Sequence, residues 1–231
     1  MIRVARHLVP AVTVEQMREV DRIMIEDLHI ELIQMMENAG RNLAELAVRQ
    51  FAPRTATVLA GPGGNGGGGL VAARHLVDRG IGTTVVLSGA DALAPMPAHQ
   101  LDILDRMRVA VEVDPVTADL VIDALIGYSL RGDPSGRAGQ LIDWANGQEA
   151  PVLALDTPSG LDVTTGEPRK PCIRAAATLT LALPKTGLLT APEHVGALYL
   201  ADISVPPVVY ERIGIRVPFL FAEDSLVELA D

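Results

Sequence analysis

Two aspartates stand where buried strands are expected to end. Asp123 follows the apolar run 120–122, and Asp156 follows the apolar run 152–155. In an open α/β sheet, ligands bind in the crevice outside the carboxyl ends of the strands. If the two strands are neighbours, both carboxylates lie at that crevice, where a buried carboxyl can have a raised pKa and act as an acid or a base. The alternative is that both aspartates cap turns or helix N-termini.

Further polar side chains are expected at the same edge. Ser159 lies in a tight turn directly after Asp156 and can point inward, and Asn65 lies in a loop after an earlier strand. Together with Asp123, these side chains would offer the carboxylate, amide and hydroxyl oxygens that a hard cation prefers. Lys185 follows a later strand. Its ammonium is a candidate for phosphate contact or proton transfer, with a surface role as the alternative.

The glycine content is concentrated in one loop. Of the 21 glycines in the chain, 7 fall between Gly61 and Gly69, between an expected strand and an expected helix. Backbone amides in such a loop, together with the helix N-terminus, can hold an anion. No charged residue occurs between Thr55 and Ala73, so amides and dipoles would have to do so without local cations. The alternative is a turn that is merely flexible.

The details of this loop argue against several nucleotide enzymes. Gly61, Gly63 and Gly66 match the pattern GxGxxG formally, but the next strand ends at Leu87 without the acidic residue of a dinucleotide dehydrogenase. The loop has no GKT or GKS, so a Walker loop is excluded, and a small-molecule kinase would lack its phosphate lysine. A second loop, 127–136, contains Arg131, which could meet a phosphate or remain a solvated charge.

Composition and charge narrow the class of protein. With 231 residues, 48% hydrophobic and 21% charged, the chain can form a large core, and one domain is favoured. Aromatic residues make up 3% and the net charge is −10, which disfavours a nucleic-acid partner. Cys172 is the lone cysteine, so a reducing, cytoplasmic setting is expected. Residues 1–10 resemble neither a signal peptide nor a membrane span.

Strands and helices alternate after an N-terminal helical part, which predicts a parallel α/β sheet. A capping box at Thr13 and Gln16 begins the first of two N-terminal helices, expected over 13–28 and 31–51. We expect a helical part over 1–52 that precedes any strand, an α/β core over 53–222 and an acidic tail over 223–231 that forms a short helix. Strands are expected at 57–60, 83–87, 109–113, 120–124, 152–156, 177–183 and 197–201, and core helices at 70–77, 98–107 and 139–146.

The chain resembles a known family, the NAD(P)H-hydrate epimerases of the YjeF N-terminal domain family. The resemblance is carried by the loop and helix 61–76, GPGGNGGGGLVAARHL, and by the segments 36–40, 121–127, 154–162, 178–187 and 196–203, in order. It implies a Rossmann-like three-layer αβα sandwich with a mostly parallel sheet and an N-terminal helical extension. It further implies a homodimer. Some members are fused to a hydrate dehydratase domain, so here a separate dehydratase is expected in the same pathway.

The resemblance also implies an activity and a set of site residues. The family interconverts the R and S forms of hydrated NADH and NADPH (NADHX and NADPHX) and binds potassium, one ion per subunit. Asn65, Asp123 and Ser159 resemble its cation ligands, and Asp156, Asp123 or Lys185 would shuttle protons. The positions that resemble substrate contacts are Gly64, Asn65, Gly66, Gly67, Gly68, Gly127, Tyr128, Ser129, Leu130, Arg131, Gly132, Asp133 and Asp156.

The glycine loop departs from the family at two positions. Where the family reads GNNGGDG, this chain has Gly64 and Gly68 in place of the first Asn and the Asp, and keeps the second Asn as Asn65. The loss of the Asp removes a polar substrate contact and one possible acid or base. It motivates an alternative function, a catalytically impaired nucleotide-binding or scaffold protein of the same fold.

Overall fold

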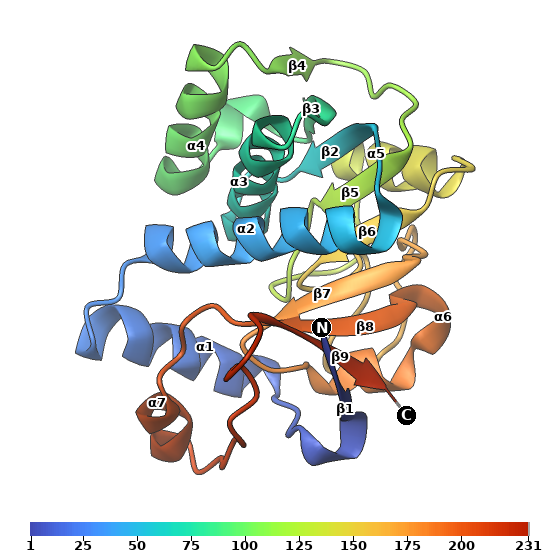
Figure 1. Ribbon diagram of the computed structural model, residues 1–231. Helices are drawn as coiled ribbons and strands as arrows, with labels where there is room; N and C mark the ends of the chain where they lie inside the picture. The colour runs from blue at the N-terminus through green and yellow to red at the C-terminus, as the bar shows by residue number, and fades with distance from the viewer. Residues whose placement is uncertain (231) are drawn as a thin grey trace.

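The computed structural model describes residues 1–230; Asp231 lies outside the described residues. The described strands form one nine-stranded sheet with the order β1-β9-β8-β7-β6-β5-β2-β3-β4 (Figure 1). Only β8 and β9 pair antiparallel among these neighbours. The strands are β1 (Ile2–Ala5), β2 (Thr55–Ala60), β3 (Gly82–Leu87), β4 (Ala110–Glu112), β5 (Leu120–Ala124), β6 (Val152–Leu155), β7 (Ala177–Leu181), β8 (Ala197–Ala201) and β9 (Leu226–Ala230).

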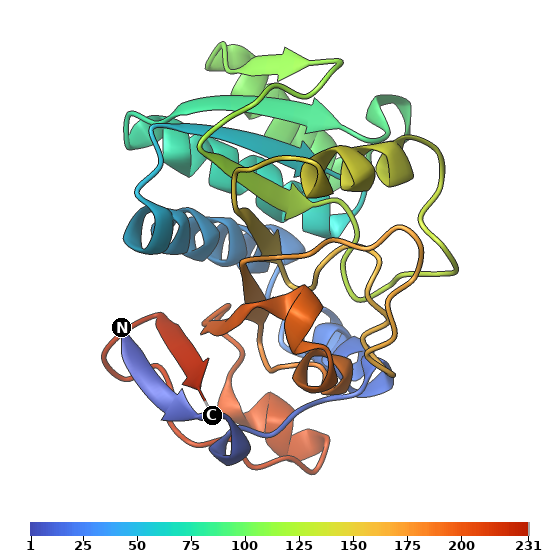
Figure 2. The same ribbon diagram turned by 90° about the vertical axis from the view of Figure 1, so that its right-hand side faces the viewer.

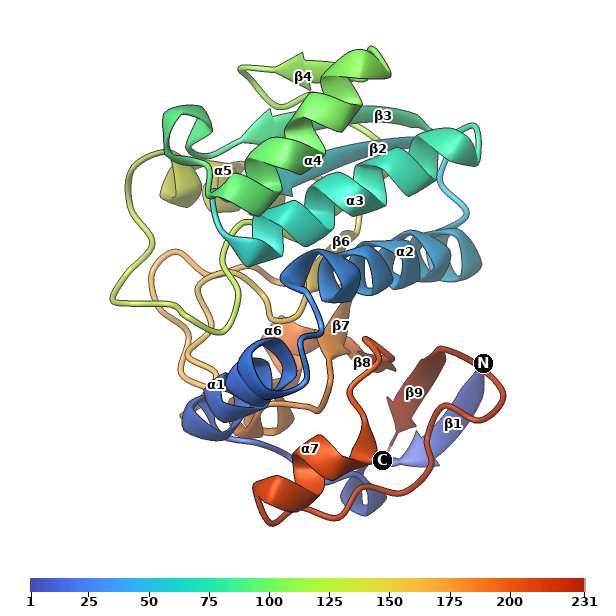
Figure 3. The same ribbon diagram turned by 90° about the vertical axis from the view of Figure 1, so that its left-hand side faces the viewer.

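Helices cover both faces of the sheet. The α-helices are α1 (Val14–Arg22), α2 (Leu32–Phe51), α3 (Gly64–Asp78), α4 (Pro95–Arg106), α5 (Gly136–Asn146), α6 (Pro192–Val195) and α7 (Pro207–Arg212). A π-helical turn, Ile23–Asp27, continues α1, and short 3-10 turns occur at Arg6–Leu8, Ala90–Ala92 and Thr186–Thr190. Figure 3 shows α2, α3 and α4 side by side on one face, whereas Figure 2 shows α5 on the other. The expected mostly parallel α/β sandwich is therefore confirmed.

The alternation of side chains along the central strands explains the three layers. Leu120 and Ile122 pack with α2 and α3 in one buried cluster, and Val121 between them packs with α5 in another. Leu153 and Ala154 divide in the same way. Because both faces of these strands are covered, the strands read as continuous apolar runs rather than as alternating ones. Asp123 is the penultimate residue of β5 and Asp156 directly follows β6, so both stand at the carboxyl ends of these strands.

Both ends of the chain differ from the expectation. The N-terminal part begins with β1, so a strand precedes the two helices, and the tail forms β9 rather than a helix. Leu226, Val227 and Leu229 are buried there, and β9 pairs with both β1 and β8. The partners of β9 lie more than 20 residues away in the sequence, so its strand conformation depends on contacts that local sequence does not show. The acidic residues around these apolar side chains also make the segment look like a solvent-exposed tail.

The start of one helix agrees with the expectation, and the start of another does not. The capping box is confirmed: Thr13 Oγ1 accepts from Gln16 N at 3.2 Å and Gln16 Oε1 accepts from Thr13 N at 2.9 Å. The helix after the glycine loop begins at Gly64, six residues before the expected Leu70. Glycine lowers helix propensity, but close packing of this turn against the sheet overrides it. Within residues 1–230, the helices are too short or too polar to cross a bilayer.

Candidate active site

The strand order brings the two aspartates to one edge. β5 lies between β2 and β6, and Asp123 stands opposite Leu59 on one side and Ala154 on the other. Asp156 follows the last residue of β6, so both carboxylates lie at the carboxyl ends of neighbouring parallel strands. The expected adjacency of these strands is confirmed, and the glycine loop after β2 lies beside them.

Asp123 is fully buried and held by three donors. Its Oδ2 accepts from Ser159 N at 2.7 Å, and its Oδ1 accepts from Ser159 Oγ at 2.6 Å and from Leu125 N at 3.2 Å. Burial raises the pKa of Asp123 to about 6, although these hydrogen bonds lower it. A charged Asp123 is therefore stabilised by neutral donors alone and would gain from a cation nearby.

Other oxygens lie around Asp123. Ser159 Oγ accepts from Ile126 N at 2.9 Å and lies 3.3 Å from Ile126 O. Asn65 lies against the loop that contains Ile126, because a Cβ placed on Gly127 would be 3.3 Å from the Asn65 Cβ. Asn65 Nδ2 is buried without a hydrogen-bond partner. Since an amide can present its oxygen or its nitrogen at one position, this unpartnered end is a place for a ligand.

Asp156 and Lys185 form a buried ion pair. Lys185 Nζ donates to Asp156 Oδ1, to Leu181 O at 3.0 Å and to Thr180 Oγ1 at 3.3 Å. The two residues are only 4% and 1% exposed, so water screens the pair little. Asp156 has φ +65°, a left-handed conformation that costs a non-glycine residue about 1–2 kcal/mol. Strain of this kind often occurs where a side chain must be aimed at a ligand.

The N-terminal segment holds Lys185 from the other side. Val12 N donates to Pro184 O at 2.9 Å, and Thr186 N donates to Val12 O at 3.1 Å. Val12 is fully buried, and α1 begins two residues later. The residues before α1 therefore tie this helix to the sheet edge, and they bring a further carboxylate, Asp21, to the site.

A cavity of about 500 Å³ lies over these groups. Its walls come from α1, α2, the glycine loop and the ends of β5, β6, β7 and β8. Asp21 faces it from α1, and its Oδ2 accepts from Tyr128 Oη at 2.5 Å. Its lining is formed by Met17, Asp21, Leu32, Met35, Met36, Ala39, Pro62, Gly63, Gly64, Asn65, Gly68, Leu125, Ile126, Gly127, Tyr128, Ser129, Leu155, Asp156, Leu181, Lys185 and Ile203.

The residues singled out from the sequence fall into three groups. Those that line the cavity are Gly64, Asn65, Gly68, Gly127, Tyr128, Ser129, Asp156 and Lys185. Those buried beside it are Asp123, Ser159, Gly66 and Gly67. Those outside its lining are Leu130, Arg131, Gly132 and Asp133, which lie further along the loop; Asp133 Oδ1 accepts from Lys170 N at 3.3 Å. The first two groups come together, and the third does not join them.

Sequence reasoning missed the contribution of α1 and α2. Asp21 is the notable case, because it stands four residues after the buried Met17 and three before the buried Met24. A carboxylate at this spacing lies beside the apolar stripe of a helix, which is a signal that could have been found. The methionines Met35 and Met36 also reach the cavity, and no local pattern distinguishes them from core residues.

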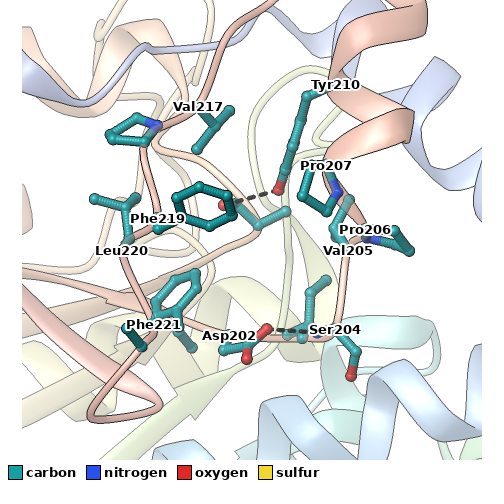
Figure 4. Close-up of a pocket in the computed structure, with 15 residues that line it drawn as sticks. Asp202, Ser204, Val205, Pro206, Pro207, Tyr210, Val217, Phe219, Leu220 and Phe221 are labelled. Carbon is teal, nitrogen blue, oxygen red and sulfur yellow. Dashed lines mark hydrogen bonds between the residues drawn. The ribbon is translucent and has the colours of Figure 1, made fainter.

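Figure 4 shows a second cavity, of about 420 Å³. Ile203 lines both this cavity and the first one. The lining of the second cavity is apolar and includes Phe219 and Tyr210, whose Oη donates to Ala182 O at 3.1 Å. Asp202 is the one ionisable carboxylate among its described lining residues, and its Oδ1 accepts from Ser204 N at 2.7 Å. The chemistry-bearing groups therefore gather in the first cavity.

Comparison with known proteins assigns the family. The family described as YjeF-related protein N-terminus matches residues 32–187, a range that includes the glycine loop, Asp123, Asp156 and Lys185. The chain belongs to this family. Met17, Asp21 and Ile203, which also line the cavity, lie outside the matched range.

Relatives and a solved structure agree with this assignment. The chain is 46% identical to an NAD(P)H-hydrate epimerase of Dehalogenimonas lykanthroporepellens, over 90% of this chain and 89% of that protein. It is 40% identical to the bifunctional NAD(P)H-hydrate repair enzyme Nnr of Hyperthermus butylicus, over 82% of this chain but only 37% of that protein. The crystal structure of the yeast protein ynu0 has the same fold, with a TM-score of 0.85 at 23% identity over 96% of this chain and 100% of that one.

Proposed function

We propose that this chain is an NAD(P)H-hydrate epimerase, which interconverts the R and S forms of hydrated NADH and NADPH at nicotinamide C6. The observation that carries the proposal is the buried Asp156–Lys185 pair at the wall of a cavity large enough for a nicotinamide ring and its ribose. A relative that shares 46% of its residues over nearly its whole length bears this activity in its name. The substrate is a small molecule, and neither nucleic acid nor a membrane is required.

The cavity offers groups for each part of such a ligand. The first amides of α3 are unpaired within the helix, and Gly63 and Gly64 line the cavity, so the N-terminus of α3 can receive the phosphates. Asn65 Nδ2 lacks a partner and can donate to an oxygen of the substrate. The methionines of α1 and α2 supply an apolar wall for the ring.

The reaction inverts one carbon atom. The hydroxyl leaves C6 as water after it has received a proton, and the ring nitrogen N1 donates its lone pair to form a C6=N1 iminium. Water then adds to the other face of C6 and releases a proton. Asp156 is the residue we assign to proton transfer, because it lines the cavity, whereas Asp123 is enclosed by Ser159 and Leu125. Lys185 balances the charge of Asp156.

A potassium ion is part of the proposal. Asp123, Ser159, Ile126 O and Asn65 supply one carboxylate and several neutral oxygens in one place. No group of three or more His, Cys, Asp or Glu occurs among the described residues, so this set suits a monovalent cation better than zinc. When bound, the cation would hold Asp123 in its charged form and leave Asp156 as the proton carrier. One ion per subunit is expected.

The alternative, a binding protein that has lost catalysis, rests on Gly68. A Cβ at that position would lie 2.7 Å from Leu155 Cδ2, so the Leu155 side chain occupies the room of the missing acid. The cavity nevertheless retains Asp21 and Asp156 as carboxylates, and the relatives carry epimerase names. The alternative is therefore not favoured.

A coupled assay tests the proposed function. Purified protein is added to the R hydrate together with a dehydratase that consumes only the S form, and NADH or NADPH formation is followed. We expect acceleration well above the spontaneous conversion in potassium buffer, and a strong reduction when sodium replaces potassium. Equal rates with and without the protein would contradict the proposal. Retained activity in sodium would contradict the proposed potassium site but not the epimerase activity.

We also propose that the protein forms a homodimer and works with a separate dehydratase. Light scattering tests the dimer.

A further inference from the structure

A second carboxylate faces the reaction cavity from a different element than Asp156. Asp21 lies on α1 and lines the cavity, with its Oδ2 held by Tyr128 Oη at 2.5 Å. Among the described lining residues, Asp21 and Asp156 are the two that carry carboxylates. They come from different elements, Asp21 from the N-terminal helix α1 and Asp156 from the end of β6, and each lines the cavity from its own wall.

The two carboxylates have different surroundings. Asp156 is ion-paired with the buried Lys185. Asp21 lacks such a partner, and burial raises its pKa above the ordinary value. The hydrogen bond from Tyr128 and the ammonium of Lys185 lower the pKa of Asp21, whereas the charge of Asp156 raises it. Two titratable groups in such different environments are a recurring sign of an acid and a base that act together.

We propose that Asp21 is the second catalytic residue of the epimerase and serves the face of the nicotinamide ring opposite to Asp156. In one direction, protonated Asp21 gives its proton to the C6 hydroxyl, the C6–O bond breaks and water leaves. The N1 lone pair forms the iminium, water adds to C6 from the side of Asp156, and the Asp156 carboxylate takes the released proton. In the other direction the two residues exchange roles, and the protons return through solvent. This role rests on the proposed epimerase activity.

The experiment compares the pH dependence of kcat/KM in Asp21→Asn, Tyr128→Phe and the wild type, after subtraction of the spontaneous rate. In the wild type, the rate falls as the pH rises through the raised pKa of Asp21, because the acid is then deprotonated. Asp21→Asn is expected to lower kcat at least 100-fold and to abolish this alkaline limb, and Asp21→Glu to restore part of the rate.

Tyr128→Phe gives a readout that a merely structural role would not move. The tyrosine hydroxyl stabilises the charged form of Asp21, so its removal raises the pKa of Asp21 further. The alkaline limb should therefore shift to higher pH. The groups that face Asp21 and Tyr128 are Arg18 of the same helix, Lys185 and Asp156, and none of them is altered in this variant.

Glu26→Gln is the matched control, because it removes one negative charge from an exposed side chain of the turn that continues α1. Its kcat should stay within twofold of the wild type. Binding of ADP-ribose, which lacks the ring, should also stay within twofold in Asp21→Asn. A kcat within threefold of the wild type in Asp21→Asn, or an unmoved limb in Tyr128→Phe, would overturn the role of Asp21 while the wild type remains active. An inactive wild type would instead overturn the proposed function.

Discussion

At the scale of single residues, the buried pair of Asp156 and Lys185 carries a stability cost, and we propose that it serves the reaction. Both side chains are almost fully enclosed, so each charge depends on the other for compensation. The backbone of Asp156 is left-handed, which adds strain. Replacement of both residues of a buried ion pair by apolar residues of similar volume is often neutral or stabilising, so stability alone does not account for this pair.

Removal of one charge should therefore be costly. We predict that Asp156→Asn lowers the free energy of unfolding by about 3–5 kcal/mol, because Lys185 is left as an uncompensated buried charge. The double variant Asp156→Asn with Lys185→Met should recover most of this loss and remain inactive. Urea unfolding and the epimerase assay measure the two quantities separately.

The exposed pair of Arg106 and Asp102 gives a matched control on α4. Its side chains are 76% and 53% exposed, so Asp102→Asn should cost no more than about 1 kcal/mol. A loss in Asp156→Asn as small as that in Asp102→Asn would contradict the buried ion pair. Full activity in Asp156→Asn would contradict its role in proton transfer.

Cys172 has cationic neighbours in the sequence, Arg169, Lys170 and Arg174, and nearby cations can lower the pKa of a thiol. It is 8% exposed, and burial raises the pKa of its thiol to about 12, despite the nearby Arg174. A thiol in this state is a poor nucleophile. The cationic neighbours in the sequence therefore do not activate it.

At the scale of elements, the glycine loop is defined by close backbone packing. A Cβ on Gly66 would lie 1.8 Å from Gly61 O, and a Cβ on Gly61 would lie 1.9 Å from Leu125 O. A Cβ on Gly64 would meet no atom within 4 Å. Glycine is therefore required at positions 61 and 66, where backbone oxygens occupy the space of a Cβ, whereas position 64 has room for a side chain.

Two alanine variants of this loop should therefore behave oppositely. Gly66→Ala is expected to destabilise the protein by about 3 kcal/mol or more, because a backbone oxygen stands where the methyl group must go. Gly64→Ala is expected to be neutral or to stabilise α3 by up to about 1 kcal/mol. Thermal unfolding followed by circular dichroism distinguishes them. Equal midpoints for the two variants would contradict the packing of this turn.

Some of the site was predictable from local sequence, and some was not. The strands β5, which contains Asp123, and β6, which Asp156 follows, are buried on both faces, so their apolar runs indicate them directly. The helical start at Gly64 was missed because glycine has low helix propensity, and only contacts with the sheet compensate for it. The position of Asp21 beside an apolar helix stripe was detectable, but its place at this cavity depends on how α1 is tied to the Lys185 segment through Val12.

At the scale of the whole molecule, the two ends of the chain complete the sheet. β9 is the partner of β1 and also pairs with β8. It buries Leu226, Val227 and Leu229 in the cluster that includes α1 and in the neighbouring core. This arrangement was not predictable, since each strand is defined by a partner at the opposite end of the sequence.

Truncation tests this closure of the sheet. We predict that a chain ending at Ser225 loses cooperative unfolding or accumulates in aggregates, because β1 has no partner and the buried leucines are lost. The control Glu228→Gln, at a partly exposed position of the same strand, should keep the wild-type midpoint. An unchanged unfolding midpoint in the truncated chain would show that residues 226–230 do not contribute to the fold. That result would contradict the pairing of β9 with β1 and β8.

We propose that the cavity between α1, the glycine loop and Asp156 is where nicotinamide C6 is inverted. The most direct test of this claim follows the two epimers by chromatography without a coupling enzyme, starting from pure R and from pure S hydrate in potassium buffer. We predict that the wild type brings both samples to the same R/S ratio far faster than buffer alone, and that Asp156→Asn does not. Conversion at the spontaneous rate in the presence of the folded wild type would contradict the claim.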